Sequence, residues 1–178
     1  DLAGGMSDEA VVATLSDYPE EGGDLWMAID SLKTVLKSNK KCHDGLVFFV
    51  HLYADRFCPM HVAHLDDQGG NKVKMKWFGQ NTNLHSVWDS KILESKGFSY
   101  TEYASYLHDV YSPQLKEIQK LTAEQTLLHT YHLTSDIYAY HTTWSGNAYH
   151  YTYHWTAPME YQLYMAGVKL AQELNKLF

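Results

Sequence analysis

Cysteine and basic residues are scarce in this 178-residue chain. Cys42 and Cys58 are too few for a disulfide framework, and they could form one bridge, remain free thiols or bind metal. Lys and Arg number 14 against 21 Asp and Glu, and the net charge of −7 argues against holding nucleic acid on a broad basic surface. Binding phosphates through metal ions stays open, because each divalent ion brings two positive charges to the site itself.

Long apolar runs are absent as well. No stretch approaches the roughly 20 residues that cross a bilayer, so we expect no membrane span. The chain begins at Asp1 without an initiator Met or an apolar leader, so either a targeting segment was removed or the chain is a fragment. With 45% hydrophobic and 20% charged residues, and no repeat or linker, we expect one domain over residues 1–178.

Hydrophobic spacing predicts a mostly α-helical fold with one small β-hairpin. Ser7 and Asp24 are expected N-caps of the first two helices, which are separated by a turn at Pro19–Gly23. Strict alternation over Lys72–Trp77 predicts a strand that ends at Gly79. The segment Leu46–Phe57 is apolar all round, which predicts a buried helix. We expect an aromatic loop between Thr142 and Trp155. Further helices are expected over Asn83–Leu93, Thr101–Leu107, Thr122–Tyr140 and Ala157–Leu177.

Two histidine–aspartate pairs suggest a metal site. His51 and Asp55 stand at i and i+4, and so do His85 and Asp89, a spacing that places both side chains on one helix face about 6 Å apart. His61 follows the first pair just beyond Pro59. Imidazole nitrogen and carboxylate oxygen are zinc ligands, and a catalytic zinc site keeps one position open for water. The alternatives are an ion pair of Asp55 with Arg56 or a helix-capping contact and, for the second pair, solvated helix residues.

Three ordered motifs resemble a known family. The run from Leu46 to Val62 resembles the central motif of the zinc-dependent single-strand nucleases of fungi, plants and bacteria, written His-Leu-x-Gly-Asp-x-His-Gln-Pro-Leu-His-Val. Asp67–Asn71 and Asn83–Asp89 are similar to its Gly-Gly-Asn and Asn-Leu-His-x-x-Trp-Asp elements, and Ala166–Asn175 to its closing helix. The resemblance spans essentially the whole chain.

The resemblance implies a helical phospholipase C/nuclease-like fold with up to three zinc ions in a cleft. His61, His85 and Asp89 would hold one zinc, the site that is complete in this chain. His51 and Asp55 would serve a neighbouring pair, with Asp55 bridging as the catalytic carboxylate. Metal-activated water would hydrolyse single-stranded DNA, RNA or 3′-nucleotides to 5′-nucleotides. The resemblance further implies a secreted or periplasmic protein, and substrate-binding roles for Asp1 and Asn71.

The chain departs from the family pattern in two ways. The family's N-terminal metal ligands have no counterpart before His51, which suggests a truncated piece, a segment supplied by a second chain, a non-catalytic relative that keeps one zinc, or chelation by Asp1 in their place. Phe57 and Cys58 stand where the family usually has His and Gln, Ala54 replaces Gly and Lys169 replaces Arg. The rival functions are therefore a zinc-stabilised protein without turnover and a zinc phospholipase C.

Overall fold

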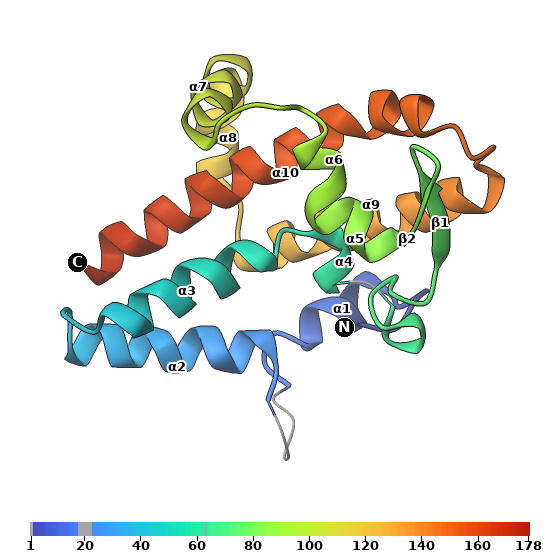
Figure 1. The fold of residues 1–178 in the computed structure, drawn as a ribbon. Coiled ribbons are helices and arrows are strands. Elements are labelled where there is room, and N and C mark those ends of the chain that lie inside the picture. The colour runs from blue at the N-terminus through green and yellow to red at the C-terminus, as the bar shows by residue number, and fades with distance from the viewer. Residues whose placement is uncertain (1, 18–22, 63) are drawn as a thin grey trace.

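Helices make up most of the molecule, as predicted. The computed structural model describes residues 2–17, 23–62 and 64–178. Figure 1 shows the long helices packed against one another, with a small hairpin at one edge. The helices are α1 (Asp8–Ala13), α2 (Leu25–Ser38), α3 (His43–Asp55), α4 (Pro59–Val62), α5 (Leu84–Ser86), α6 (Ile92–Glu94), α7 (Tyr100–Tyr111), α8 (Leu115–Lys120), α9 (Ala123–Thr143) and α10 (Ala148–Leu177).

Side-chain caps determine where several helices begin. Ser7 accepts a hydrogen bond from the backbone of Ala10, and Asp24 accepts one from Met27, so both expected N-caps are confirmed. The predicted turn at Pro19–Gly23 lies almost wholly outside the described residues. Pro59 occupies the first position of α4, where its missing N–H costs no hydrogen bond. The chain thus leaves α3 and immediately starts a second, short helix.

The core lies where α3 packs between α2 and α10. Figure 1 shows α2 and α3 side by side, with α10 crossing on the other side of α3. The apolar side chains between them and the neighbouring elements are fully buried, including Ile29, Leu36, Phe49 and Met165. Within the described residues, no helix is both long and apolar enough to span a membrane.

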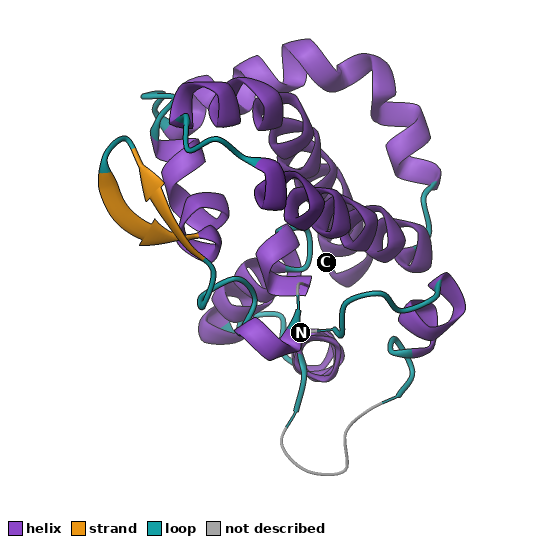
Figure 2. Ribbon diagram, turned by 90° about the vertical axis from the view of Figure 1, so that its right-hand side faces the viewer, coloured by secondary structure: helices purple, strands orange, loops and turns teal. Residues whose placement is uncertain are grey.

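The predicted strand is part of a two-stranded antiparallel hairpin, coloured orange in Figure 2. Strand β1 (Lys74–Trp77) pairs with β2 (Gln80–Asn83), and Lys74 stands opposite Asn83. Along β1 the lysines are exposed while Met75 and Trp77 are buried, as the alternation predicted. The turn uses left-handed backbone at Phe78 and Gly79, with φ of 46° and 82°.

The helix after the hairpin begins as predicted but contains an irregular turn. Asn83 caps it by accepting a hydrogen bond from the backbone of Ser86. Residues Val87–Lys91 then form a π-helical turn, η2, between α5 and α6. Such turns insert an extra residue and occur frequently at functional sites. Asp89 lies within this turn.

Two predictions from the sequence are wrong. The helix over residues 46–57 is not buried all round, because Val47 is 52% exposed and Phe48 is 59% exposed. The expected aromatic loop is mostly helix, because α10 starts at Ala148. Asn147 caps that start by accepting hydrogen bonds from the backbones of Tyr149 and His150. The sequence prediction also missed α8 and two short 3₁₀ turns, η1 (Leu65–Asp67) and η3 (Ser112–Gln114).

Candidate metal centre

The five predicted metal ligands come from three separate segments. His51 and Asp55 lie on the last turns of α3, and His61 lies on α4. His85 belongs to α5, and Asp89 to the π-helical turn that follows. Packing of the Val87–Lys91 turn against α4 brings the two halves of the sequence pattern to one place.

His61 is the residue that joins them. Its Nδ1 lies 3.5 Å from Oδ2 of Asp55, and its Nε2 lies 3.1 Å from Oδ1 of Asp89. On α3, Nε2 of His51 lies 3.3 Å from the same Asp55 oxygen. The Asp55 side chain is 21% exposed and that of His51 is 67% exposed, so the cluster reaches the surface. The structure therefore brings together the two carboxylates and two of the three imidazoles by direct contact.

His85 lies beside the cluster, next to His61, but among the described residues the group of ligand atoms within 4.8 Å of one another is Cys58, His61 and Asp89 and does not include His85. Its ring lies 5.2 Å from the His61 ring, centroid to centroid. Its Nδ1 lies 2.8 Å from the carbonyl oxygen of Gly69, so this nitrogen carries the proton and donates to that oxygen. Metal-binding histidines are commonly oriented in this way, with the second ring nitrogen left unprotonated for the metal. His85 is therefore fixed in the tautomer that can bind metal through Nε2.

The Gly69–Gly70 turn holds His85 in place. Gly70 has φ of +79°, in the left-handed region that favours glycine, and its carbonyl accepts from the backbone of His85 at 3.4 Å. The Gly70 amide donates to Oδ1 of Asp67 at 2.7 Å, and the hydroxyl of Tyr138 donates to the same carboxylate. Burial and the neighbouring Asp67 raise the pKa of Tyr138, which keeps its hydroxyl a donor. These supporting residues were not predicted, although the Gly-Gly motif pointed to the turn.

The sequence left undecided whether Cys58 forms a disulfide, remains a free thiol or binds metal. It does not bridge Cys42, because both cysteines are free and Cys42 stands at the opposite end of α3. Its sulfur, one ring nitrogen of His61 and one Asp89 oxygen all lie within 4.8 Å of one another. Burial raises the pKa of the Cys58 thiol to about 12, so without metal the group is neutral.

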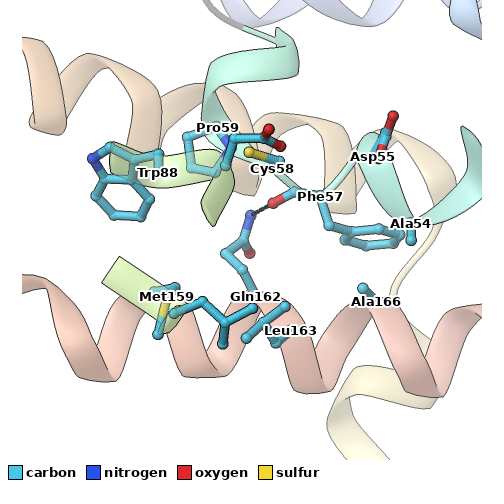
Figure 3. Close-up of a pocket in the computed structure, with 12 residues that line it drawn as sticks. Ala54, Asp55, Phe57, Cys58, Pro59, Trp88, Met159, Gln162, Leu163 and Ala166 are labelled. Atoms are coloured by element: carbon cyan, nitrogen blue, oxygen red, sulfur yellow. Dashed lines mark hydrogen bonds between the residues drawn. The ribbon is translucent and has the colours of Figure 1, made fainter. Parts of the chain in front are cut away.

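A cavity of about 170 Å³ adjoins these ligands. Figure 3 shows Asp55, Cys58 and Pro59 on one wall and residues of α10 on the facing wall. Except for the two carboxylates, the thiol and Gln162, the lining is apolar: Ala54, Phe57, Pro59, Trp88, Leu93, Met159, Leu163 and Ala166. Gln162 is buried and donates to the carbonyl of Phe57 at 2.9 Å, which fixes the chain between α3 and α4 against α10. The cavity can hold a flat or apolar group beside the metal ligands.

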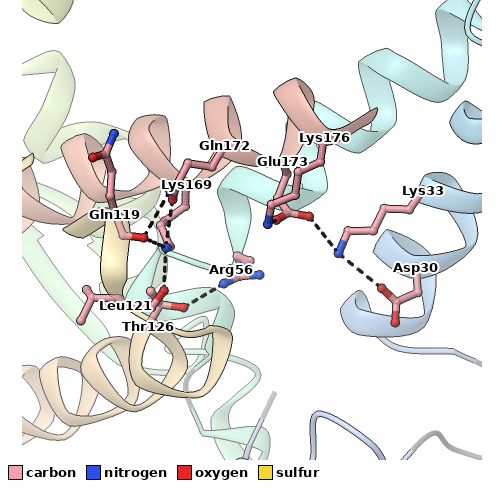
Figure 4. A network of polar contacts seen from close by, with 10 residues as sticks. All are labelled: Asp30, Lys33, Arg56, Gln119, Leu121, Thr126, Lys169, Gln172, Glu173 and Lys176. Carbon is pink, nitrogen blue, oxygen red and sulfur yellow. Dashed lines mark hydrogen bonds and ion pairs between the residues drawn. The ribbon is translucent and has the colours of Figure 1, made fainter. Parts of the chain in front are cut away.

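Arg56 does not pair with Asp55, the alternative considered for that carboxylate. Figure 4 shows Arg56 in a separate polar network, where it donates to Thr126 at 2.8 Å. Its guanidinium lies over the rings of Trp26, Tyr53 and Phe57, each between 4.6 and 4.8 Å away. Lys169 in the same network donates to the carbonyls of Gln119 and Leu121 at the end of α8, so its role is structural.

Asn71, one of the two predicted substrate-binding residues, does not line the cavity. Asn71 donates to the carbonyl of Gln68 at 2.9 Å and lies 3.5 Å from the side chain of Asn83, in the turn that precedes the hairpin. Its contacts within the described chain are structural, and its substrate role stays a prediction. Asp1 lies outside the described residues.

Comparison with known proteins gives a consistent set of relatives. A family model described as S1/P1 Nuclease matches residues 7–178. Endonuclease 2 of Arabidopsis thaliana is 29% identical over 167 residues, covering 83% of this chain and 57% of the relative. Endonuclease 4 of the same plant is 34% identical over 88 residues, covering 49% of this chain and 28% of the relative. Nuclease S1 of Aspergillus oryzae is 29% identical over 91 residues, covering 48% and 31%. The matches thus span between 28% and 57% of the lengths of these three relatives.

Proposed function

The chain belongs to the S1/P1 nuclease family, and from this we propose that it hydrolyses phosphodiester bonds in single-stranded DNA and RNA with the help of bound zinc. The proposed products are 5′-nucleotides. The observation that supports zinc is the contact of His61 with Asp89, two residues from distant segments, with the His85 ring 5.2 Å from the ring of His61. A net charge of −7 also fits a protein that holds phosphate through metal rather than through basic side chains.

The donor set suits zinc. Two imidazoles and a carboxylate are the numbers and types of ligand found in catalytic zinc sites, which leave one position open. The His85 tautomer, fixed by Gly69, leaves a nitrogen free to bind. Asp55 and His51 add a carboxylate and an imidazole beside this set, as a neighbouring metal would require.

Different residues are proposed to bind the metal, to accept a proton and to accommodate the substrate. Zinc in such a site acidifies water and stabilises negative charge on a phosphate oxygen. His61, His85 and Asp89 would hold this zinc, and the Gly69 carbonyl accepts from Nδ1 of His85 and so fixes the orientation of its ring. Asp55 is 3.3 Å from His51 and 3.5 Å from His61, and it orients the attacking water and accepts its proton. The adjoining apolar cavity accommodates the nucleobase or sugar, with Trp88 and Phe57 in its walls. Contacts with a base face tolerate any sequence.

The proposal is tested by activity and metal content together. The chain is loaded with zinc, its metal content is measured, and it is incubated with single-stranded DNA, duplex DNA and phosphatidylcholine vesicles. We expect at least one tightly bound zinc, preferential cleavage of the single strand and loss of activity in chelator. Zinc without turnover would support a zinc-stabilised binding protein instead, and cleavage of phosphatidylcholine alone would support a phospholipase.

Comparing His85→Ala with a second histidine variant separates the loss of zinc binding from a general effect of losing a histidine. We expect His85→Ala to lose zinc, to lose activity and to melt at a lower temperature than wild type in the presence of zinc, because bound metal stabilises the folded state by mass action. His150 is exposed on α10 and does not line the cavity, so His150→Ala is the matched control and should leave all three unchanged. Equal zinc content in His85→Ala and wild type would contradict the assignment.

A further inference from the structure

The thiol of Cys58 lies among the proposed metal ligands. The backbone amide of Cys58 donates to the carbonyl of Asp55 at 2.9 Å, and the amide of His61 donates to the carbonyl of Cys58 at 3.0 Å. These two hydrogen bonds fold residues 55–61 into a tight turn. This turn contains Asp55, Cys58 and His61, which stand three residues apart in the sequence. Figure 3 shows the Cys58 sulfur on the cavity wall that also carries Asp55.

The distances are close to those of a formed site. The Cys58 sulfur, a His61 nitrogen and an Asp89 oxygen lie within 4.8 Å of one another in the absence of metal. In a tetrahedral zinc site with a Zn–S bond of about 2.3 Å and a Zn–N bond of about 2.0–2.1 Å, sulfur and nitrogen are about 3.5 Å apart. The difference between these two separations is at most about 1.3 Å, and we expect rotation of the side chains to close it. His85 stands against His61 on the other side.

We propose that Cys58 binds, through its sulfur, the metal ion held by His61 and Asp89. On binding, the Cys58 S–H bond breaks, the proton passes to solvent and a sulfur–metal bond forms, with no change in oxidation state. Sulfur ligands favour thiophilic cations such as Zn²⁺ over Mg²⁺ and Ca²⁺. Together with His61, His85 and Asp89 the sulfur would make four protein ligands, and zinc sites can expand to five ligands in the transition state, which leaves a position for water or substrate. The inference rests on the proposed function only in requiring a metal at His61 and Asp89.

Cobalt(II) provides the test, because it occupies zinc sites and its absorption reports the ligands. We titrate the metal-free protein with Co²⁺ and expect visible d–d bands together with a near-ultraviolet sulfur-to-cobalt charge-transfer band. Cys58→Ser should retain the visible bands and lose the near-ultraviolet band. It should also bind cobalt at least about 10- to 100-fold more weakly, because loss of a mere hydrogen-bond partner of a metal ligand already weakens metal binding by that factor. Cys42→Ser is the matched control and should keep both bands.

X-ray absorption at the zinc edge tests the same bond in the wild-type chain and so does not depend on how a variant folds. A sulfur neighbour at about 2.3 Å supports the inference. Visible cobalt bands without charge transfer, and only nitrogen and oxygen around zinc, would overturn it and leave the proposed zinc site standing. Absence of any cobalt band would overturn both. Loss of the near-ultraviolet band in Cys42→Ser but not in Cys58→Ser would also overturn it.

Discussion

Replacing Gly70 with alanine is expected to disturb the metal centre without replacing a metal ligand. The backbone at Gly70 has φ of +79°, and left-handed backbone costs a residue with a Cβ about 1–2 kcal/mol. A Cβ at this position would also lie 2.9 Å from the Met60 sulfur, 3.2 Å from the backbone nitrogen of His85 and 3.3 Å from Cβ of Leu84. Met60 and Leu84 are fully buried, so neither can move freely. Overpacking of this kind costs about 1–3 kcal/mol, which gives a total of about 2–5 kcal/mol.

Gly79 provides the matched control. Its φ of +82° is almost the same, but an added Cβ there meets no described atom within 4 Å. Gly79→Ala should therefore cost only the backbone contribution of about 1–2 kcal/mol. Urea unfolding of the metal-free proteins measures both losses, and the difference between them isolates the steric contact beside His85.

The same pair of variants separates stability from metal binding. A shift of the His85 backbone moves the ring whose Nδ1 donates to Gly69, so Gly70→Ala should weaken zinc binding by about 10- to 100-fold. Gly79→Ala should leave zinc affinity unchanged. Equal losses of stability in the two variants, or unchanged zinc affinity in Gly70→Ala, would refute the argument that this turn positions His85.

Three further predictions concern the residues that support the fold. Arg56→Lys should lower the free energy of unfolding by about 1–3 kcal/mol, because lysine lacks the planar guanidinium that stacks on three rings; urea unfolding measures it. Tyr138→Phe removes the donor to Asp67 and should cost about 1–2 kcal/mol in the same assay. Burial lowers the pKa of His129 and His141, so the unfolded chain takes up protons first and stability should fall as pH drops through about 6.5. His129→Gln should flatten that decline in the metal-free protein, and an identical pH profile would contradict it.

Features that depend on neighbouring residues in the sequence were predictable. The N-caps at Ser7 and Asp24 were recognised because a capping side chain bonds to an amide only three residues away. The hairpin strand was recognised because alternation of exposed Lys74 and buried Met75 follows from strand geometry alone. The π-helical turn at Asp89 was not, since an extra residue in a helix leaves no periodic mark in so short a segment.

The wrong predictions concern features that depend on how the helices pack against one another. Hydrophobic residues occupy both faces of α3, and periodicity cannot say which face another element covers. The structure covers the face with Phe49 and exposes Val47 and Phe48. The start of α10 was missed because its aromatic residues suggested a loop. Yet Gly146 and Asn147 mark a helix start, and Tyr151 and Trp155 are buried one helical turn apart.

The candidate site shows the same division between local and long-range information. Spacing of four residues could place His51 beside Asp55, and His85 beside Asp89, because each pair shares a helix. It could not bring Cys58 to Asp89, which is 31 positions away in the chain, since that proximity depends on packing of the π-helical turn against α4. A cysteine in an apolar segment does not by itself indicate a metal site. It becomes a candidate ligand only when the fold places a carboxylate from another segment beside it. The ligand that we propose at Cys58 is therefore one that the sequence motif could not single out.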